Sequence, residues 1–141
     1  GPIGMYLLGM VPEGYEDKSY PMKSFFDNKI NMSSSTDFPA LSGAPDSPFG
    51  IMEIAVTGMS DPTEQLPWWT EELLTREQAL QVLTINGAKQ MFLEDERGCI
   101  KVGKYADFLL IDQDVLRCEA QNIHNTKVVA TYFEGKEVYK K

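Results

Sequence analysis

The sequence predicts an α/β protein, because an amphipathic helix leads into a short strand and a run of strands closes the chain. Met22, Phe25 and Phe26 repeat at the spacing of one helix face directly after Pro21, and proline favours the first position of a helix. The stretch 30–37 follows and is typical of one short strand that ends in a carboxylate. A helix that leads into a strand is half of the alternating pattern that builds parallel sheets.

Length and charge narrow the class of protein. The 141 residues suffice for one domain with a real core, and are equally the length of a piece of something larger. A net charge of -8 argues against binding to nucleic acid or to an anionic membrane surface, since both need clustered Lys and Arg. No apolar run approaches the roughly 20 residues of a spanning helix, and no signal peptide is evident. We expect a cytoplasmic protein, with Cys99 and Cys118 reduced.

Asp37 is the candidate site residue of the stretch 30–37. In a strand, side chains alternate between two faces, so Asn31, Ser33 and Asp37 share one small and polar face. Pro39 cannot continue a sheet ladder, which leaves the Asp37 carboxylate at the C-terminal end of the strand. In α/β folds chemistry is usually placed at that end. The alternative is that Asp37 only caps the following loop through its side-chain oxygens.

A second helix is expected from Pro48 to about Thr57, because Ser47 is suited to cap it. Its buried face is expected to carry Ile51, Met52, Ala55 and Val56. The loop that follows ends in Trp68-Trp69. These two rings could form part of a substrate-facing lid, but we favour packing beneath the loop, because Trp is usually largely buried.

Two short consecutive helices are expected after Thr75. Thr75 and Gln78 have the spacing of a capping box, and an apolar helix face begins at Ala79. Asn86-Gly87 interrupts this pattern, which then resumes at Ala88, Met91 and Phe92, so a bend is predicted at Asn86-Gly87. The charged run 94–97 is interpreted as solvated surface.

Strands dominate from Gly98 onward, where glycines separate segments rich in β-branched and aromatic residues. Phe108 to Ile111 is continuously apolar, and we expect it to be covered on both faces. The segments 127–133 and 136–139 flank Glu134-Gly135, which is typical of a tight hairpin. We therefore divide the chain into an α/β part, 1–97, and a β module, 98–141.

These motifs resemble the C-terminal part of the amidohydrolase superfamily. The resemblance rests on Ser35-Thr36-Asp37-Phe38-Pro39, on Phe133 to Tyr139, and above all on the Gly98 to Asp107 pattern of Gly-x-x-x-x-Gly-Lys-x-Ala-Asp before an apolar strand. The most similar branch is the large amidohydrolase group that includes formamide-deformylase-like and exoenzyme-regulator-like proteins. The resemblance implies that 1–97 is the last part of a distorted (β/α)₈ barrel and that 98–141 is part of a composite β-sandwich.

The resemblance also implies a chemistry for Asp37. It would end the eighth barrel strand, contact a divalent metal, with zinc favoured, and take a proton from the attacking water. A metal lowers the pKa of bound water to about 7, and a neighbouring carboxylate can pass the proton to a leaving amine. The implied activity is hydrolysis of C–N bonds in small-molecule amides or cyclic amides.

One expected feature is missing from this chain. The family holds its metal mainly through histidines on earlier strands, whereas the chain has one histidine, His124, which stands alone and is not expected to be a ligand. We therefore expect the isolated chain to bind no metal and to be inactive. The alternative is a non-enzymatic binding or assembly module derived from an amidohydrolase. Unpaired strand edges predict a homo-oligomer.

Overall fold

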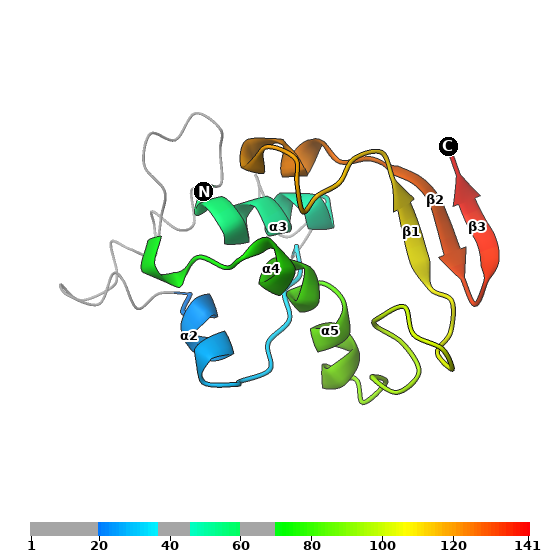
Figure 1. The fold of residues 1–141 in the computed structure, drawn as a ribbon, viewed down its shortest axis with the longest axis horizontal. Coiled ribbons are helices and arrows are strands. Elements are labelled where there is room, and N and C mark those ends of the chain that lie inside the picture. Colours follow the sequence, from blue (N-terminus) through cyan, green and yellow to red (C-terminus); the bar gives the residue numbers. More distant parts are fainter. Residues whose placement is uncertain (1–19, 37–45, 60–69) are drawn as a thin grey trace.

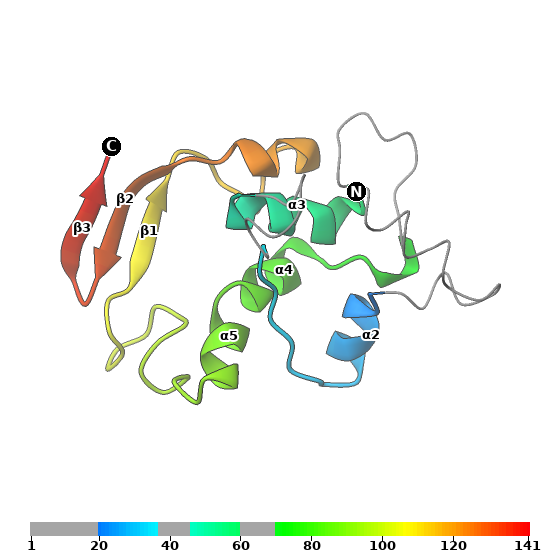
Figure 2. The same ribbon diagram turned by 180° about the vertical axis from the view of Figure 1, so that it is seen from behind.

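The computed structural model describes residues 20–36, 46–59 and 70–141. Helices gather at one end of the molecule and a small sheet lies at the other, as two opposite views show (Figure 1, Figure 2). The elements are α2 (Met22–Asp27), α3 (Pro48–Thr57), η2 (Thr70–Glu72), α4 (Arg76–Val82), α5 (Ile85–Gln90), β1 (Phe108–Ile111), η3 (Ala120–Asn125), β2 (Val128–Phe133) and β3 (Lys136–Lys140). None of the helices in these ranges is long and apolar enough to cross a membrane.

The first two predicted helices are confirmed. Helix α2 begins directly after Pro21, which occupies the N-cap position. Helix α3 begins at Pro48, and the Ser47 hydroxyl accepts a hydrogen bond from the Phe49 N–H at 3.3 Å. It ends at Gly58, whose φ of 71° is the left-handed conformation that glycine adopts without steric cost. Local cap chemistry therefore sets both ends of α3.

The capping box of α4 is confirmed, but the bend lies elsewhere than predicted. Thr75 Oγ1 accepts a hydrogen bond from the Gln78 N–H at 3.2 Å, and Gln78 Oε1 accepts one from the Thr75 N–H at 2.9 Å. Asn86-Gly87 lies inside α5, so the predicted break there is wrong. The chain breaks at Thr84, whose hydroxyl donates to the Leu80 carbonyl oxygen at 2.7 Å, a back-bond that often bends helices.

The predicted apolar face of the second short helix is also wrong beyond Ala88. Helix α5 ends at Gln90, and the next two side chains point outward, with 63% of Met91 and 89% of Phe92 exposed. Phe92 has a φ of 57°. The Gly98 backbone packs against this side of α5 instead, so closely that a Cβ on Gly98 would lie 2.7 Å from Ala88 Cβ.

The core lies among the helices. Helix α3 packs against η3 and α4, and Met52 and Ile123 are almost completely buried. The buried cluster comprises Phe49, Met52, Ala55, Leu74, Ala79, Val82, Val115 and Ile123. Val115 and Ile123 come from the segment between β1 and β2, so the core draws on both sides of the boundary predicted at residues 97 and 98.

The sheet has the order β1-β2-β3, and both pairs are antiparallel. The hairpin between β2 and β3 is confirmed. Glu134 and Gly135 join the two strands with φ values of 50° and 75°, the positive values that a type I′ turn requires at both central positions. All described strands therefore come from Phe108 onward, in the predicted β module.

Two strand predictions are wrong. Residues 30–36 form no strand, because a strand needs a hydrogen-bonded neighbour and no described segment lies beside them as one. Strand β1 is not covered on both faces, since Leu109 is 45% and Leu110 47% exposed. Among the described strands β1 pairs only with β2, and no described layer of the structure covers these two side chains.

Candidate functional site

The stretch that leads to Asp37 lies against α5. Asn31 Nδ2 donates to the Asn86 carbonyl oxygen at 3.1 Å, and Ser33 Oγ donates to Gln90 Oε1 at 2.5 Å. Met32, between them, packs against the buried core. The alternation predicted from the sequence is therefore present at these three positions, although no sheet imposes it. The polar side of the stretch faces α5 and its apolar side faces the core.

Asp37 itself lies outside the described residues, as do Trp68 and Trp69. The catalytic and metal-binding roles assigned to Asp37 therefore stay predictions. The structure does show how the chain is held before Asp37: residues 31–33 make two hydrogen bonds to α5 and one contact with the core.

Arg97 directly precedes the Gly98 to Asp107 motif and joins its last residue to the hairpin, a role that no sequence pattern indicated. Its guanidinium group is paired with the Asp107 carboxylate and lies 2.9 Å from Glu134 Oε1. It lies over the rings of Tyr105 and Phe133, at 4.5 Å and 4.9 Å from their centroids. The hydrogen bond to Glu134 is the main cause that raises the pKa of Arg97 above its ordinary value, and the pairing with Asp107 adds to it. The interpretation of 94–97 as solvated surface is thus wrong for Arg97, whose side chain is only 23% exposed.

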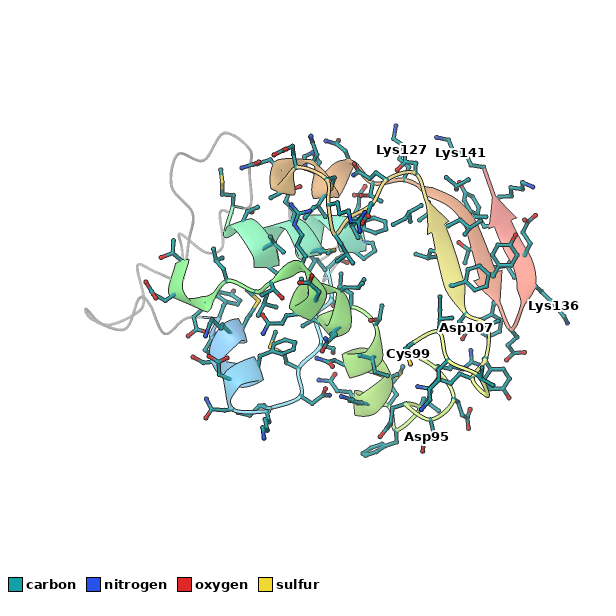
Figure 3. All side chains as sticks on the ribbon, in the orientation of Figure 1. Asp95, Cys99, Asp107, Lys127, Lys136 and Lys141 are labelled. Carbon is teal, nitrogen blue, oxygen red and sulfur yellow. The ribbon has the colours of Figure 1, made fainter. Side chains whose placement is uncertain are left out.

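The same motif closes a loop on itself and fastens it to the hairpin. Lys104 Nζ donates to the carbonyl oxygens of Glu94 and, at 3.2 Å, Arg97. Asp107 Oδ1 accepts the Glu134 N–H at 2.8 Å. Figure 3 shows Asp107 where this loop meets the sheet. Gly98 and Gly103 have φ values of 88° and 93°, which explains why glycine occupies both positions. The Lys104 and Asp107 side chains therefore hold the loop to its own backbone, to Arg97 and to the hairpin.

His124 contacts a buried acid. Its backbone N–H donates to Glu53 Oε2 at 2.8 Å, and its Nδ1 lies 2.7 Å from the same oxygen. Glu53 is only 8% exposed, whereas 41% of the His124 side chain is exposed. The pair joins η3 to α3. A buried carboxylate needs such partners, and the sequence offered no clue to it, because Glu53 lies 71 residues away.

A second carboxylate, that of Glu72, accepts hydrogen bonds from Ser24 in the first turn of α2. Glu72 Oε1 accepts the Ser24 hydroxyl at 2.5 Å, and Glu72 Oε2 accepts the Ser24 N–H at 2.8 Å. These two hydrogen bonds, the hydroxyl first, lower the pKa of Glu72 because both favour its ionised form. Across residues 20–36, 46–59 and 70–141, no three His, Cys, Asp or Glu side chains gather closely enough to hold a metal ion.

Comparison with known proteins identifies the class. The resemblance to the amidohydrolase superfamily that the sequence indicated is confirmed. Residues 8–139 match the sequence model of the Amidohydrolase family. Because this match covers nearly the whole chain, the chain belongs to the amidohydrolase family.

Two curated proteins and one solved structure are similar to this chain. The N-substituted formamide deformylase of Arthrobacter pascens is 30% identical over 118 residues, which are 84% of this chain and 21% of that protein. Protein LONG AFTER FAR-RED 3 of Arabidopsis thaliana is 26% identical over 122 residues, 86% of this chain and 20% of that protein. The crystal structure of an amidohydrolase from Thermotoga maritima MSB8 is 29% identical, with a TM-score of 0.43, and the match covers 52% of this chain and 18% of that one. The chain thus spans about a fifth of the length of the curated relatives.

Proposed function

We propose that this chain is the C-terminal part of a metal-dependent hydrolase that cleaves C–N bonds of small-molecule amides or cyclic amides. The observation that carries the proposal is the family match over residues 8–139. The similarity to a protein named N-substituted formamide deformylase supports a substrate with an amide-type C–N bond. In this proposal 1–97 completes a (β/α)₈ barrel and 98–141 contributes to a composite β-sandwich.

Asp37 is the proposed catalytic residue and a proposed metal ligand. Its carboxylate would accept the proton of the attacking water and return it to the leaving amine, the ordinary work of a general acid–base group. The anchoring of 31–33 on α5 supports this role, because a catalytic side chain acts best when the backbone that precedes it is fixed.

The described residues do not by themselves fit a metal centre. A catalytic zinc normally has three protein ligands, whereas no such group occurs in the described ranges and His124 is engaged with Glu53. Zinc, the metal we favour, would need ligands in addition to Asp37 from outside the described residues. No reaction step is therefore assigned to the metal.

The isolated chain is proposed to be inactive, cytoplasmic and self-associating. The sheet edges that are unpaired among the described residues, and the exposed apolar side chains of Phe92, Ile100 and Val102, favour contact between copies. The second candidate function is a non-enzymatic binding or assembly module. The ion pairs of Arg97 with Asp107 and Glu134 favour it, because these charged side chains stabilise the loop and the hairpin and have no catalytic role.

Measuring the metal content of the isolated chain tests whether the chain is an enzyme by itself, which both proposals deny. After dialysis, the isolated chain is expected to hold far less than one equivalent of zinc, iron or manganese and to turn over no amide. Near-stoichiometric metal together with amidase turnover would show that the chain is complete by itself. Reading the coding frame upstream then chooses between the two, since a continuous frame with a His-x-His pair supports the hydrolase and a start codon near Gly1 supports the module.

A further inference from the structure

Helix α5 lies between two other parts of the chain. Two opposite views show the stretch 30–36 on one side of this helix and the loop that follows it on the other (Figure 1, Figure 2). Successive residues of a helix are roughly 100° apart, so Ile85 and Ala88 share one side of α5. Asn86 and Gln90 lie on another side, roughly 150° from the first. Each of these two sides contacts a different neighbour.

The stretch 30–36 is held on the side of Asn86 and Gln90. Asn31 Nδ2 donates to the Asn86 carbonyl oxygen at 3.1 Å, and Ser33 Oγ donates to Gln90 Oε1 at 2.5 Å. The first hydrogen bond is partly buried and is accepted by the backbone, whereas the second joins two exposed side chains. An exposed hydrogen bond adds little to stability. The bond between Ser33 and Gln90 can therefore be removed by substitution while the chain stays folded.

The Gly98 backbone lies against the opposite side of α5. A Cβ added to Gly98 would lie 2.7 Å from Ala88 Cβ and 3.0 Å from Ile85 Cα, so no larger residue fits there without a shift. Gly98 directly follows Arg97, whose guanidinium group pairs with acids of the loop and of the hairpin. The ion pairs of Arg97 therefore hold Gly98 in place, and Gly98 supports α5 on the side away from the stretch 30–36.

We propose that Ser33 and Gln90 are positioning residues of the proposed hydrolase, and that α5, supported by Gly98, fixes the stretch that leads to Asp37. Three residues separate Ser33 from Asp37, so a displacement at Ser33 is carried along a short length of backbone. A misplacement of about 1 Å at a reacting group can lower the rate about 100-fold. The inference rests on the proposed function, because it requires Asp37 to be the group that accepts the proton.

The methyl NMR resonance of Met32 tests the structural half of the inference in the 141-residue chain. Met32 lies between the two anchored residues of the stretch and packs against the core, so its methyl group reports where the stretch lies. Gln90→Leu removes the acceptor and is expected to shift this resonance. Lys89→Leu, at the exposed neighbouring position of α5, is expected to leave it in place. The almost completely buried Met52 is expected to keep its resonance in both variants. A Met32 resonance that Gln90→Leu does not move overturns the inference.

A pair of glycine variants tests the support of α5. Gly98→Ala is expected to shift the Met32 resonance, because the new Cβ pushes on Ala88 and Ile85. Gly103→Ala is the matched control: its φ of 93° gives a similar backbone strain, but nothing lies within 4 Å of the new Cβ, and the Met32 resonance is expected to stay in place. A folded Gly98→Ala variant with an unmoved Met32 resonance overturns the support by Gly98. If Gly98→Ala fails to fold, Gln90→Leu still decides the structural half.

The activity of the longer protein at saturating metal tests the functional half, with hydrolysis of N-methylformamide, a small open-chain amide, as the assay. Ser33→Ala and Gln90→Leu are each expected to lower kcat between about 10- and 100-fold and to change KM less than about 2-fold. Ser33→Thr keeps the hydroxyl group and is expected to recover most of the rate. Lys89→Leu is expected to leave both constants unchanged. Because Ser33 acts through Asp37, adding Ser33→Ala to Asp37→Asn is expected to lower kcat no further.

The outcomes separate this inference from the proposed function. If Asp37→Asn lowers kcat but Ser33→Ala and Gln90→Leu do not, the positioning role is overturned and the proposed function stands. Additive losses for Ser33→Ala and Asp37→Asn also overturn it, since Ser33 would then act independently of Asp37. If Asp37→Asn keeps its activity, the proposed function itself fails, and the positioning role fails with it.

Discussion

The pair of His124 and Glu53 offers the sharpest stability test, because one buried oxygen receives both of its hydrogen bonds from a single residue. Replacing His124 with Ala removes the ring contact at 2.7 Å but keeps the backbone N–H contact at 2.8 Å. A hydrogen bond to a charged group contributes about 1.5–3 kcal/mol. Since 41% of the His124 side chain is exposed to water, we expect the lower part of that range, about 1.5–2 kcal/mol.

The expected loss is measurable by urea unfolding followed by circular dichroism. In thermal unfolding of a chain close to 150 residues, 1 kcal/mol corresponds to roughly 2–4 °C in Tm. Asn125→Ala is the matched control on η3, because its side chain is exposed and makes one long contact of 3.4 Å, and it is expected to change stability by less than about 0.5 kcal/mol.

A double-mutant cycle with Glu53→Gln isolates the pair. If the two side chains interact as described, the double variant His124→Ala with Glu53→Gln loses less stability than the sum of the two single losses. Additive losses, or a His124→Ala variant as stable as the Asn125→Ala control, would refute this account of the buried carboxylate.

Two further predictions concern a glycine and an acid. Gly98→Ala is expected to destabilise the chain by roughly 1–3 kcal/mol, since its φ is 88° and its Cβ would meet Ala88 at 2.7 Å; Gly87→Ala, with nothing within 4 Å of the new Cβ, is expected to be neutral or stabilising in the same urea assay. Because the pKa of Glu72 is lowered by Ser24, the stabilisation by this contact is present above the ordinary carboxyl pKa and is lost as the pH falls through the lowered value. The stability difference between the wild type and Ser24→Ala is therefore expected near neutral pH and to vanish in acid, and a difference that persists unchanged at low pH would contradict it.

Features controlled by neighbouring residues could be predicted from the sequence. Ser47 and Gly58 limit α3, Thr75 and Gln78 cap α4, and the turn before β3 follows from the glycine at position 135. Each depends on atoms within a few residues of one another. Local chemistry therefore gave the correct beginning of most helices and the hairpin.

Features that depend on distant partners could not be predicted. Period-two alternation in 30–36 was interpreted as a strand, but a strand exists only with a neighbour, and these residues lie on α5 instead. The apolar run of β1 indicated burial without showing what would cover it. Arg97 has partners 10 and 37 residues away, and neither could be recognised from a charged run.

The central claim is that Asp37 performs acid–base chemistry in an amidohydrolase whose C-terminal part is this chain. The most direct measurement compares amide hydrolysis, at saturating metal, by the longer protein carrying Asp37→Asn and by the same protein carrying Asp95→Asn. Asp95 is an exposed acid on the loop after α5 (Figure 3), and its replacement is expected to leave activity unchanged. Asparagine preserves the shape and hydrogen bonding of a loop cap but cannot accept the proton. The account predicts that Asp37→Asn lowers kcat at least about 100-fold, whereas activity above about a tenth of the wild-type value, well short of that range, would reduce Asp37 to a loop cap.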